Sequence, residues 1–269
     1  MATLVTFHAH PDDECITCGG VMRAAADAGH RVVLVIATGG EHGEIVQDVL
    51  EPGETLAHRR HAETLESARI LGAARTEFLG YVDSGMVGTE TNTGEGAFAA
   101  ADVEEAAAKL AAILREEDAD VLTHYDDHGG YGHPDHVQVH HVGRRAAELA
   151  GTPRVYQATT NRDEMRRLMA MAREMGLGLG DGEGPDEREM EAMGTPEAEL
   201  TTRVDVTPWL ATKRDAMRAH ASQIAPDSFF LALPDEAFAA AFGTEWFLRV
   251  GEPAGGPFET DLFGVASQP

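Results

Sequence analysis

Two short segments of this chain combine His and Asp side chains with a proline: residues 10–14 (HPDDE) and residues 133–136 (HPDH). In each, residues three apart can point the same way if the second residue opens a helix. Two His and one carboxylate leave an open coordination position, as in catalytic zinc sites. Water held by such a metal ionises near neutral pH and can attack a carbonyl. The pattern therefore favours a metal hydrolase over a structural metal site.

The carboxylates and imidazoles beyond a three-ligand set suit the remaining steps of such a hydrolysis. Asp12, adjacent to Asp13, could take a proton from the attacking water. His133, if it is not a ligand, could stabilise the oxyanion as an imidazolium. Asp135 could then hold His133 protonated and oriented. Each segment alone is typical of a helix N-terminal cap beside a surface His, so their joint occurrence carries the interpretation.

Hydrophobic periodicity predicts an α/β fold of Rossmann-like, doubly wound type: a mostly parallel sheet with helices on both faces and a smaller C-terminal α+β portion. We expect strands over 3–9, 31–37, 76–79, 121–124, 154–158, 203–206 and 245–250, and helices over 14–29, 55–71, 102–117, 134–149, 162–175 and 208–224. Asp102 is the expected N-cap of its helix. Both His-Asp segments then follow parallel strands, at the edge of the sheet where ligands bind.

The same reading predicts one domain over residues 1–250. It comprises a core over 1–175, a mobile acidic loop or lid over 176–200 and a C-terminal portion over 201–250, followed by a loosely ordered tail over 251–269. Cys15 and Cys18 could form a redox pair, but two small helix residues are the favoured interpretation. His140 and His141 are expected to be packing or surface residues.

The composition limits the class of partner. The net charge is −25, from 46 acidic and 21 basic residues, which argues against nucleic acid because phosphate backbones are bound by dense Lys and Arg. No apolar stretch reaches the roughly 18 residues that span a bilayer, and residues 1–7 are not typical of a signal peptide. We therefore expect a cytoplasmic protein with no membrane partner and leave its oligomeric state open.

At these motifs the chain resembles the LmbE-like (PIG-L type) zinc deacetylases, which remove the acetyl group from N-acetylglucosaminyl conjugates. The two His-Asp segments are similar to the family's signatures, residues 38–43 to its turn after the second strand, and residues 219–223 to its late helix. The resemblance covers most of the chain, to about Val250. It implies zinc bound by His10, Asp13 and His136, with iron as the open alternative. It also implies Asp12 as general base and His133, oriented by Asp135, on the oxyanion side.

Within that family, residues 81–86 (YVDSGM) and 129–132 (GGYG) look most like the mycothiol branch. That branch contains a deacetylase of N-acetylglucosaminyl-inositol and an amidase of mycothiol S-conjugates. The resemblance implies that Arg60 and Asp83 bind sugar or inositol hydroxyls and that Tyr131 reaches the reacting carbonyl. The predicted partner is thus a small amino-sugar conjugate. The alternatives are the conjugate amidase, an iron oxygenase using two His and a carboxylate, and a non-enzymatic metal-binding protein.

Overall fold

A seven-stranded mixed sheet forms the centre of the protein, in a computed structural model that describes residues 1–174 and 187–264. The strand order is β3-β2-β1-β4-β5-β7-β6. The strands β1 to β5 are parallel to their neighbours, whereas β7 runs antiparallel to both β5 and β6. Their bounds are β1 Thr3–His8, β2 Arg31–Thr38, β3 Arg75–Tyr81, β4 Val121–Tyr125, β5 Arg154–Thr159, β6 Thr202–Asp205 and β7 Thr244–Arg249.

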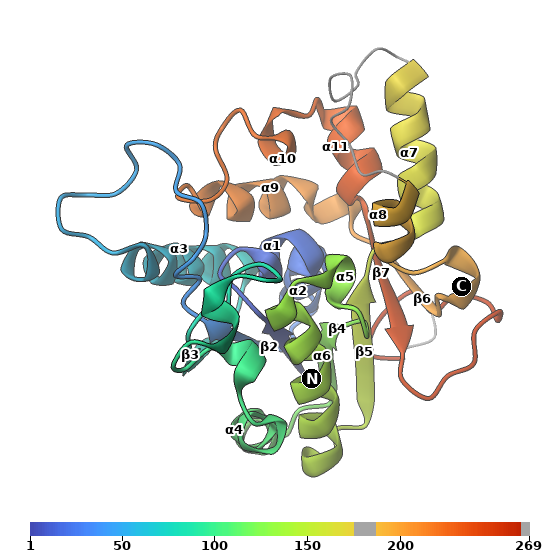
Figure 1. Ribbon diagram of the computed structural model, residues 1–269. Coiled ribbons are helices and arrows are strands. Elements are labelled where there is room, and N and C mark those ends of the chain that lie inside the picture. Colours follow the sequence, from blue (N-terminus) through green and yellow to red (C-terminus); the bar gives the residue numbers. More distant parts are fainter. Residues whose placement is uncertain (175–186, 265–269) are drawn as a thin grey trace.

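Helices cover both faces of this sheet, as Figure 1 shows, which explains why β1, β2 and β4 are almost entirely buried. One group contains α1, α2, α3 and α9, and the other is built on α4 and α6. The bounds are α1 Asp13–Thr17, α2 Gly19–Asp27, α3 Leu56–Leu71, α4 Val103–Glu116, α5 Gly129–Gly132, α6 Pro134–Ala150, α7 Arg162–Glu174, α8 Glu187–Ala192, α9 Leu210–Ala219, α10 Phe229–Ala232 and α11 Asp235–Phe242. Short 3₁₀ turns lie at η1 Glu90–Thr93, η2 Phe98–Ala100, η3 Glu197–Glu199 and η4 Thr207–Trp209.

The predicted Rossmann-like architecture is confirmed, and its topology places the two His-Asp segments. The strands β1 and β4 are neighbours in the sheet, although the chain leaves them in opposite directions to build β2 and β5. Such a switch point opens a crevice beyond the carboxyl ends of the two strands. Residues 9–14 follow β1 and residues 126–136 follow β4, so both segments meet at this crevice. The predicted N-cap is confirmed as well: Asp102 accepts a hydrogen bond from the amide of Glu105.

The single helix expected over 14–29 is wrong, because the chain breaks into α1 and α2 at Cys18 (φ −130°). The carboxylate of Glu245 accepts hydrogen bonds from the amides of Gly20 (2.7 Å) and Val21 (2.9 Å) and so starts a new helix there. A Cβ atom on Gly20 would collide with the side chain of Val206. The contacts with Glu245 and Val206 therefore determine where the helix breaks.

Three other boundaries differ from the prediction in the C-terminal half. The helix expected over 208–224 ends at Ala219. The predicted acidic loop contains α8 and η3. Its residues 176–186 lie outside the described residues, as does Met175, the last residue of the helix predicted over 162–175. The segment from Pro253, expected to be loosely ordered, is joined to the sheet: the carboxylate of Glu259 accepts from Thr202 (3.1 Å), and Leu262 is buried. Among the described residues, none of the helices is long and apolar enough to cross a membrane.

Candidate functional site

The first segment leaves β1 in a strained turn. Asp12 has φ 105°, a region that residues with a Cβ atom rarely occupy. Its amide donates to Oε2 of Glu14 (2.9 Å), and Asp13 then opens α1. The Asp13 carboxylate turns back and accepts from the amide of His10 (2.8 Å). These contacts hold three successive polar side chains at the crevice in fixed orientations.

The second segment starts α6 with His133 as its N-cap and Pro134 in its first turn. The Nδ1 atom of His133 accepts a hydrogen bond from the backbone amide of Asp135 (3.1 Å). The neutral His133 ring must therefore carry its proton on Nε2. His136 lies in the same first turn, and its ring centroid is 5.3 Å from that of His133.

Three ligand atoms meet between the two segments. Nδ1 of His10 lies 3.5 Å from Oδ2 of Asp13 and 3.3 Å from Nε2 of His136, and the last two atoms are 3.4 Å apart. Ligands about 2.0–2.1 Å from a tetrahedral metal are separated from one another by about 3.3–3.4 Å. The predicted ligand set therefore fits a small divalent cation. A second grouping, His10, His133 and His136, also places its ring nitrogens within 4.8 Å of one another.

The electrostatics of this cluster also suit a cation. Burial lowers the pKa of His10, but hydrogen bonds with Asp13, Asp135 and Asp83 outweigh it and raise the pKa well above its usual value. Burial raises the pKa of Asp13, yet the adjacent His136 and His10 hold it well below the ordinary range. The Asp13 carboxylate thus stays ionised and favours positive charge beside it.

The expected pairing of Asp135 with His133 is wrong for its side chain. The Asp135 carboxylate accepts from the hydroxyl (2.5 Å) and the amide (2.8 Å) of Ser84, and its Oδ2 lies 3.2 Å from Nε2 of His10. The backbone amide of Asp135, by contrast, donates to the His133 ring. The carboxylate lies behind a candidate ligand because the first turn of α6 directs it toward the loop after β3.

Asp12 and His133, the two candidate proton-transfer groups, have shifted pKa values. Burial raises the pKa of Asp12 to about 6, with Arg60 opposing and Asp13 adding to the shift. Burial and the neighbouring His10 and His136 lower the pKa of His133 to about 4. The structure therefore favours a neutral His133 at pH 7, with Nε2–H as the donor, over the expected imidazolium.

Arg60 and Asp83 lie beside the cluster, and both are buried. Arg60 donates to the carbonyls of Gly40 (2.8 Å) and Pro11 (2.5 Å) and lies 3.4 Å from Asp12 Oδ2. Its Nε atom is buried and has no partner among the described residues. Asp83 accepts from the amides of Gly85 (2.8 Å) and His42 (3.2 Å), and its Oδ1 lies 3.4 Å from Nε2 of His10.

Tyr131, on α5, is the one candidate side chain that is half exposed, and its ring centroid is 4.9 Å from that of His136. It therefore stands at the mouth of the crevice. His140 is buried and bonded to the carbonyl of Tyr125 (3.1 Å), whereas His141 is exposed, as expected of packing and surface residues.

Sequence reasoning missed a buried network that supports Asp12. Glu14 Oε1 lies 2.6 Å from Nε2 of His220 and accepts from the hydroxyl of Ser67 (2.5 Å), while its other oxygen holds the Asp12 amide. All three side chains are buried. Glu14, Ser67 and His220 are too far apart in sequence for any local spacing to link them. Only the resemblance of residues 219–223 to the family's late helix pointed to His220.

Both cysteine thiols are free and buried. Burial raises the pKa of Cys18 to about 12, and Cys15 donates to the carbonyl of Asp12 (3.0 Å). A redox thiol needs a lowered pKa and access to solvent. These residues are therefore packing residues around the break between α1 and α2, as the favoured interpretation held.

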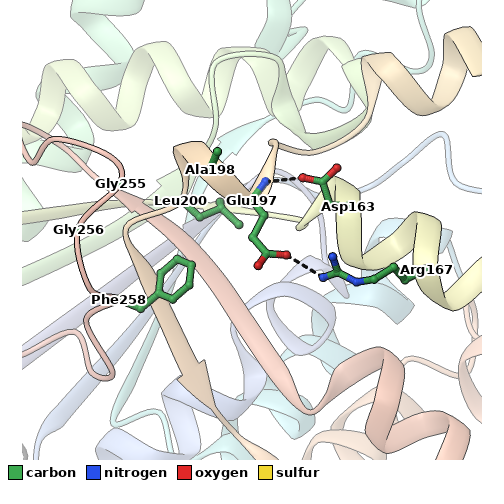
Figure 2. A pocket seen from close by; sticks show the side chains of 8 residues that line it. All are labelled: Asp163, Arg167, Glu197, Ala198, Leu200, Gly255, Gly256 and Phe258. Atoms are coloured by element: carbon green, nitrogen blue, oxygen red, sulfur yellow. Dashed lines mark hydrogen bonds and ion pairs between the residues drawn. The ribbon is translucent and has the colours of Figure 1, made fainter.

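A hollow of about 660 Å³ lies elsewhere, between α7, η3 and the segment near Phe258; Figure 2 shows the side chains that line it. Its charged groups already pair with one another: Glu197 accepts from Arg167 (2.7 Å) and donates its amide to Asp163 (2.8 Å). None of the candidate site residues lines it. The crevice at the switch point therefore remains the candidate site.

The sequence has relatives of known name along its whole length. Residues 5–147 match the family described as PIG-L, GlcNAc-PI de-N-acetylase. A protein of Streptomyces avermitilis named 1D-myo-inositol 2-acetamido-2-deoxy-alpha-D-glucopyranoside deacetylase is 40% identical over 285 aligned residues, covering 98% of this chain and 97% of the relative.

Solved structures with the same fold are more distant in sequence. The N,N'-diacetylchitobiose deacetylase of Pyrococcus horikoshii has a TM-score of 0.58 at 24% identity, covering 92% of this chain and 83% of that one. GalB, the 4-carboxy-2-hydroxymuconate hydratase of Pseudomonas putida, has a TM-score of 0.58 at 17% identity, covering 96% and 100%. Since deacetylases and a hydratase share it, this fold alone does not define an activity. By the family match and the full-length relatives, the chain belongs to the PIG-L family.

Proposed function

We propose that this protein is a metal-dependent N-deacetylase that acts on an N-acetylglucosamine conjugate such as N-acetylglucosaminyl-inositol, with zinc as its metal. The observation that carries the proposal is the set of three ligand atoms on His10, Asp13 and His136, 3.3–3.5 Å apart, beside the spare carboxylate of Asp12. Full-length relatives named as deacetylases support it. A cytoplasmic location stays our prediction from the sequence.

His10, Asp13 and His136 would hold the metal, which supplies Lewis acidity to the attacking water and to the amide carbonyl. His10 is suited to this role because its other ring nitrogen faces Asp135 and Asp83, which fix the ring and increase its basicity. Zinc accepts such a set of two imidazole nitrogens and one carboxylate oxygen.

Asp12 would remove a proton from water and then deliver it to the departing amine. Its pKa of about 6 places it close to neutral pH, where a carboxylate can both accept and return a proton. The strained backbone at Asp12, held by Glu14 and by the Arg60 contact to Pro11, keeps the carboxylate oriented. Orientation of this kind is a large part of general-base efficiency.

His133 would donate Nε2–H to the oxyanion that forms on the amide carbonyl, and Tyr131 would reach the same oxygen from the mouth. A neutral imidazole is a sufficient donor, and the contact with the Asp135 amide fixes its tautomer. Asp83 and the unpartnered Nε of Arg60 would bind hydroxyls of the sugar or of inositol. An unpaired buried donor is costly until a ligand satisfies it.

A panel of N-acetylglucosamine derivatives tests the proposal, with and without an inositol aglycone and with one thiol conjugate that carries a larger amide. Free amine would be measured for the zinc-loaded protein and for Asp12→Asn. We expect release from the inositol conjugate to exceed release from the bare sugar. Preference for the larger amide would point to the conjugate amidase instead. If no amide is cleaved at any metal concentration, the proposal fails.

A further inference from the structure

The loop that carries Tyr131 is held through the backbone of Gly130, the residue before it. Gly129, Gly130 and Gly132 all have positive φ (66°, 73° and 90°), and glycine restricts the backbone less than residues that carry a Cβ atom. The amide of Gly130 donates to Oδ1 of Asp126 (2.7 Å), and its carbonyl accepts from the amide of Gly194 (2.9 Å). Both backbone hydrogen-bonding groups of Gly130 are therefore fixed, its carbonyl by a distant part of the chain.

Asp126 connects this loop to the end of β5. It is 1% exposed, and its second oxygen accepts from the hydroxyl of Thr159 (2.5 Å). The Thr159 hydroxyl also lies 2.9 Å from the hydroxyl of Thr195. A carboxylate can only accept a hydrogen bond. The hydroxyl of Thr195 therefore donates to Thr159, which in turn donates to Asp126.

Residues 193–195, which we call the strap, are themselves firmly attached. Arg162 donates to the carbonyls of Met193 (2.8 Å) and Gly194 (2.7 Å), and the amide of Thr195 donates to the carbonyl of Thr160 (2.8 Å). Gly194 has φ 57°, and a Cβ atom there would collide with that same carbonyl of Thr160. Only glycine fits where the strap crosses to the Tyr131 loop.

We propose that the strap, acting with Asp126 and Thr159, positions the Tyr131 ring at the mouth of the site and thereby supports turnover. None of these three parts touches the candidate ligand atoms, so they act through Tyr131. The inference rests on the proposed function, because it assigns Tyr131 a contact with the substrate. It adds to that function a set of positioning residues that the sequence motifs do not contain.

The test removes one hydroxyl. Thr159→Val keeps the shape of the side chain but removes the hydroxyl that Asp126 Oδ2 and Thr195 contact, whereas Thr159→Ser retains it. Oδ1 of Asp126 still accepts from the Gly130 amide, and His128 Nε2 lies 3.4 Å from Oδ2. Thr152→Val is the matched control, because its hydroxyl is buried without a partner among the described residues and precedes β5. Amide hydrogen exchange of Gly130 and Gly194 should accelerate about tenfold in Thr159→Val. Exchange should stay near the wild-type rate in the other two variants.

Turnover is then measured in a double-mutant cycle with Tyr131→Phe, with bound zinc measured for each variant. We expect Thr159→Val to lower kcat/KM about five- to tenfold in the wild-type background and less than twofold in the Tyr131→Phe background, at unchanged zinc content. Equal losses in both backgrounds, or unchanged hydrogen exchange, would overturn the inference. If the wild-type protein cleaves no amide, the proposed function fails, and the inferred role in turnover fails with it. The exchange data would still report separately whether the strap holds the loop.

Discussion

The Nε2 atom of His10 lies 3.2 Å from Oδ2 of Asp135, while its Nδ1 atom faces Asp13 and His136. One imidazole thus uses both nitrogens, one toward the candidate metal position and one toward a fully buried carboxylate. Ser84 fixes that carboxylate through its hydroxyl and its amide. Asp135 is therefore placed to orient a ligand, which differs from the role on His133 that the sequence suggested.

Asp135→Asn tests this relationship. Loss of the carboxylate should weaken zinc binding by about 10–100-fold, the usual effect of removing a group that orients a metal-ligating His. Zinc affinity would be measured by competition with a chromogenic chelator, and Asp127→Asn, at an exposed carboxylate, is the control. Unchanged zinc affinity combined with a large loss of kcat would instead support a role on His133.

Asp13→Ala and His133→Ala separate two groupings that could hold a metal, one with Asp13 and one with His133. If the ligands are His10, Asp13 and His136, Asp13→Ala should lose bound zinc, and His133→Ala should keep it while kcat falls about 10²–10³-fold. Zinc per chain after dialysis is the measurement, and His141→Ala on the same helix is the control. Zinc loss in His133→Ala with retention in Asp13→Ala would assign the three-histidine group instead.

Asp12→Asn should retain zinc and lose about 10²–10⁴-fold in kcat, because the amide cannot accept the proton. The wild-type pH profile carries the same information. Asp12 acts when ionised, and burial raises its pKa to about 6, so activity is present above that pH and falls as the pH drops through it. A bound cation lowers the pKa, which places the acid limb at or below pH 6. Near-normal turnover by Asp12→Asn would refute the base assignment.

Arg60→Ala should affect two kinetic constants for different reasons. Loss of the contacts to Gly40 and Pro11 loosens the Asp12 turn, so kcat should fall for every substrate. Loss of the unpartnered Nε donor should raise KM more for the inositol conjugate than for N-acetylglucosamine. Arg69→Ala, on the exposed side of the same helix, is the control. Equal changes in KM for both substrates would argue against recognition of the aglycone by Arg60.

The parts of the fold that local pattern determines were predicted well from the sequence. The buried strands β1, β2 and β4 and the capped helix α4 depend on burial and on residues close in sequence. The meeting of residues 10–14 with residues 133–136 followed from parallel topology, because both segments leave neighbouring strands at the same edge. No knowledge of side-chain contacts was needed for it.

The contacts that sequence could not supply join residues with no local relationship. Glu245 breaks the first helix at Cys18, Ser84 captures Asp135, and His220 pairs with Glu14. Each contact depends on which side chains the packed core brings within about 3 Å of each other, and the spacing of residues along the chain does not predict this. The Asp135 carboxylate contacts Ser84 and His10 for this reason, and the contact with His133 that the sequence suggested is made by the Asp135 amide.

The most direct test of metal-dependent deacetylation is free-amine release from N-acetylglucosaminyl-inositol by protein of known zinc content. We predict that turnover scales with bound zinc, stops when a chelator removes it, and returns on addition of one equivalent of zinc per chain. Turnover that persists in the zinc-free protein, or zinc-loaded protein that releases no amine from any N-acetylglucosamine conjugate, would contradict the account.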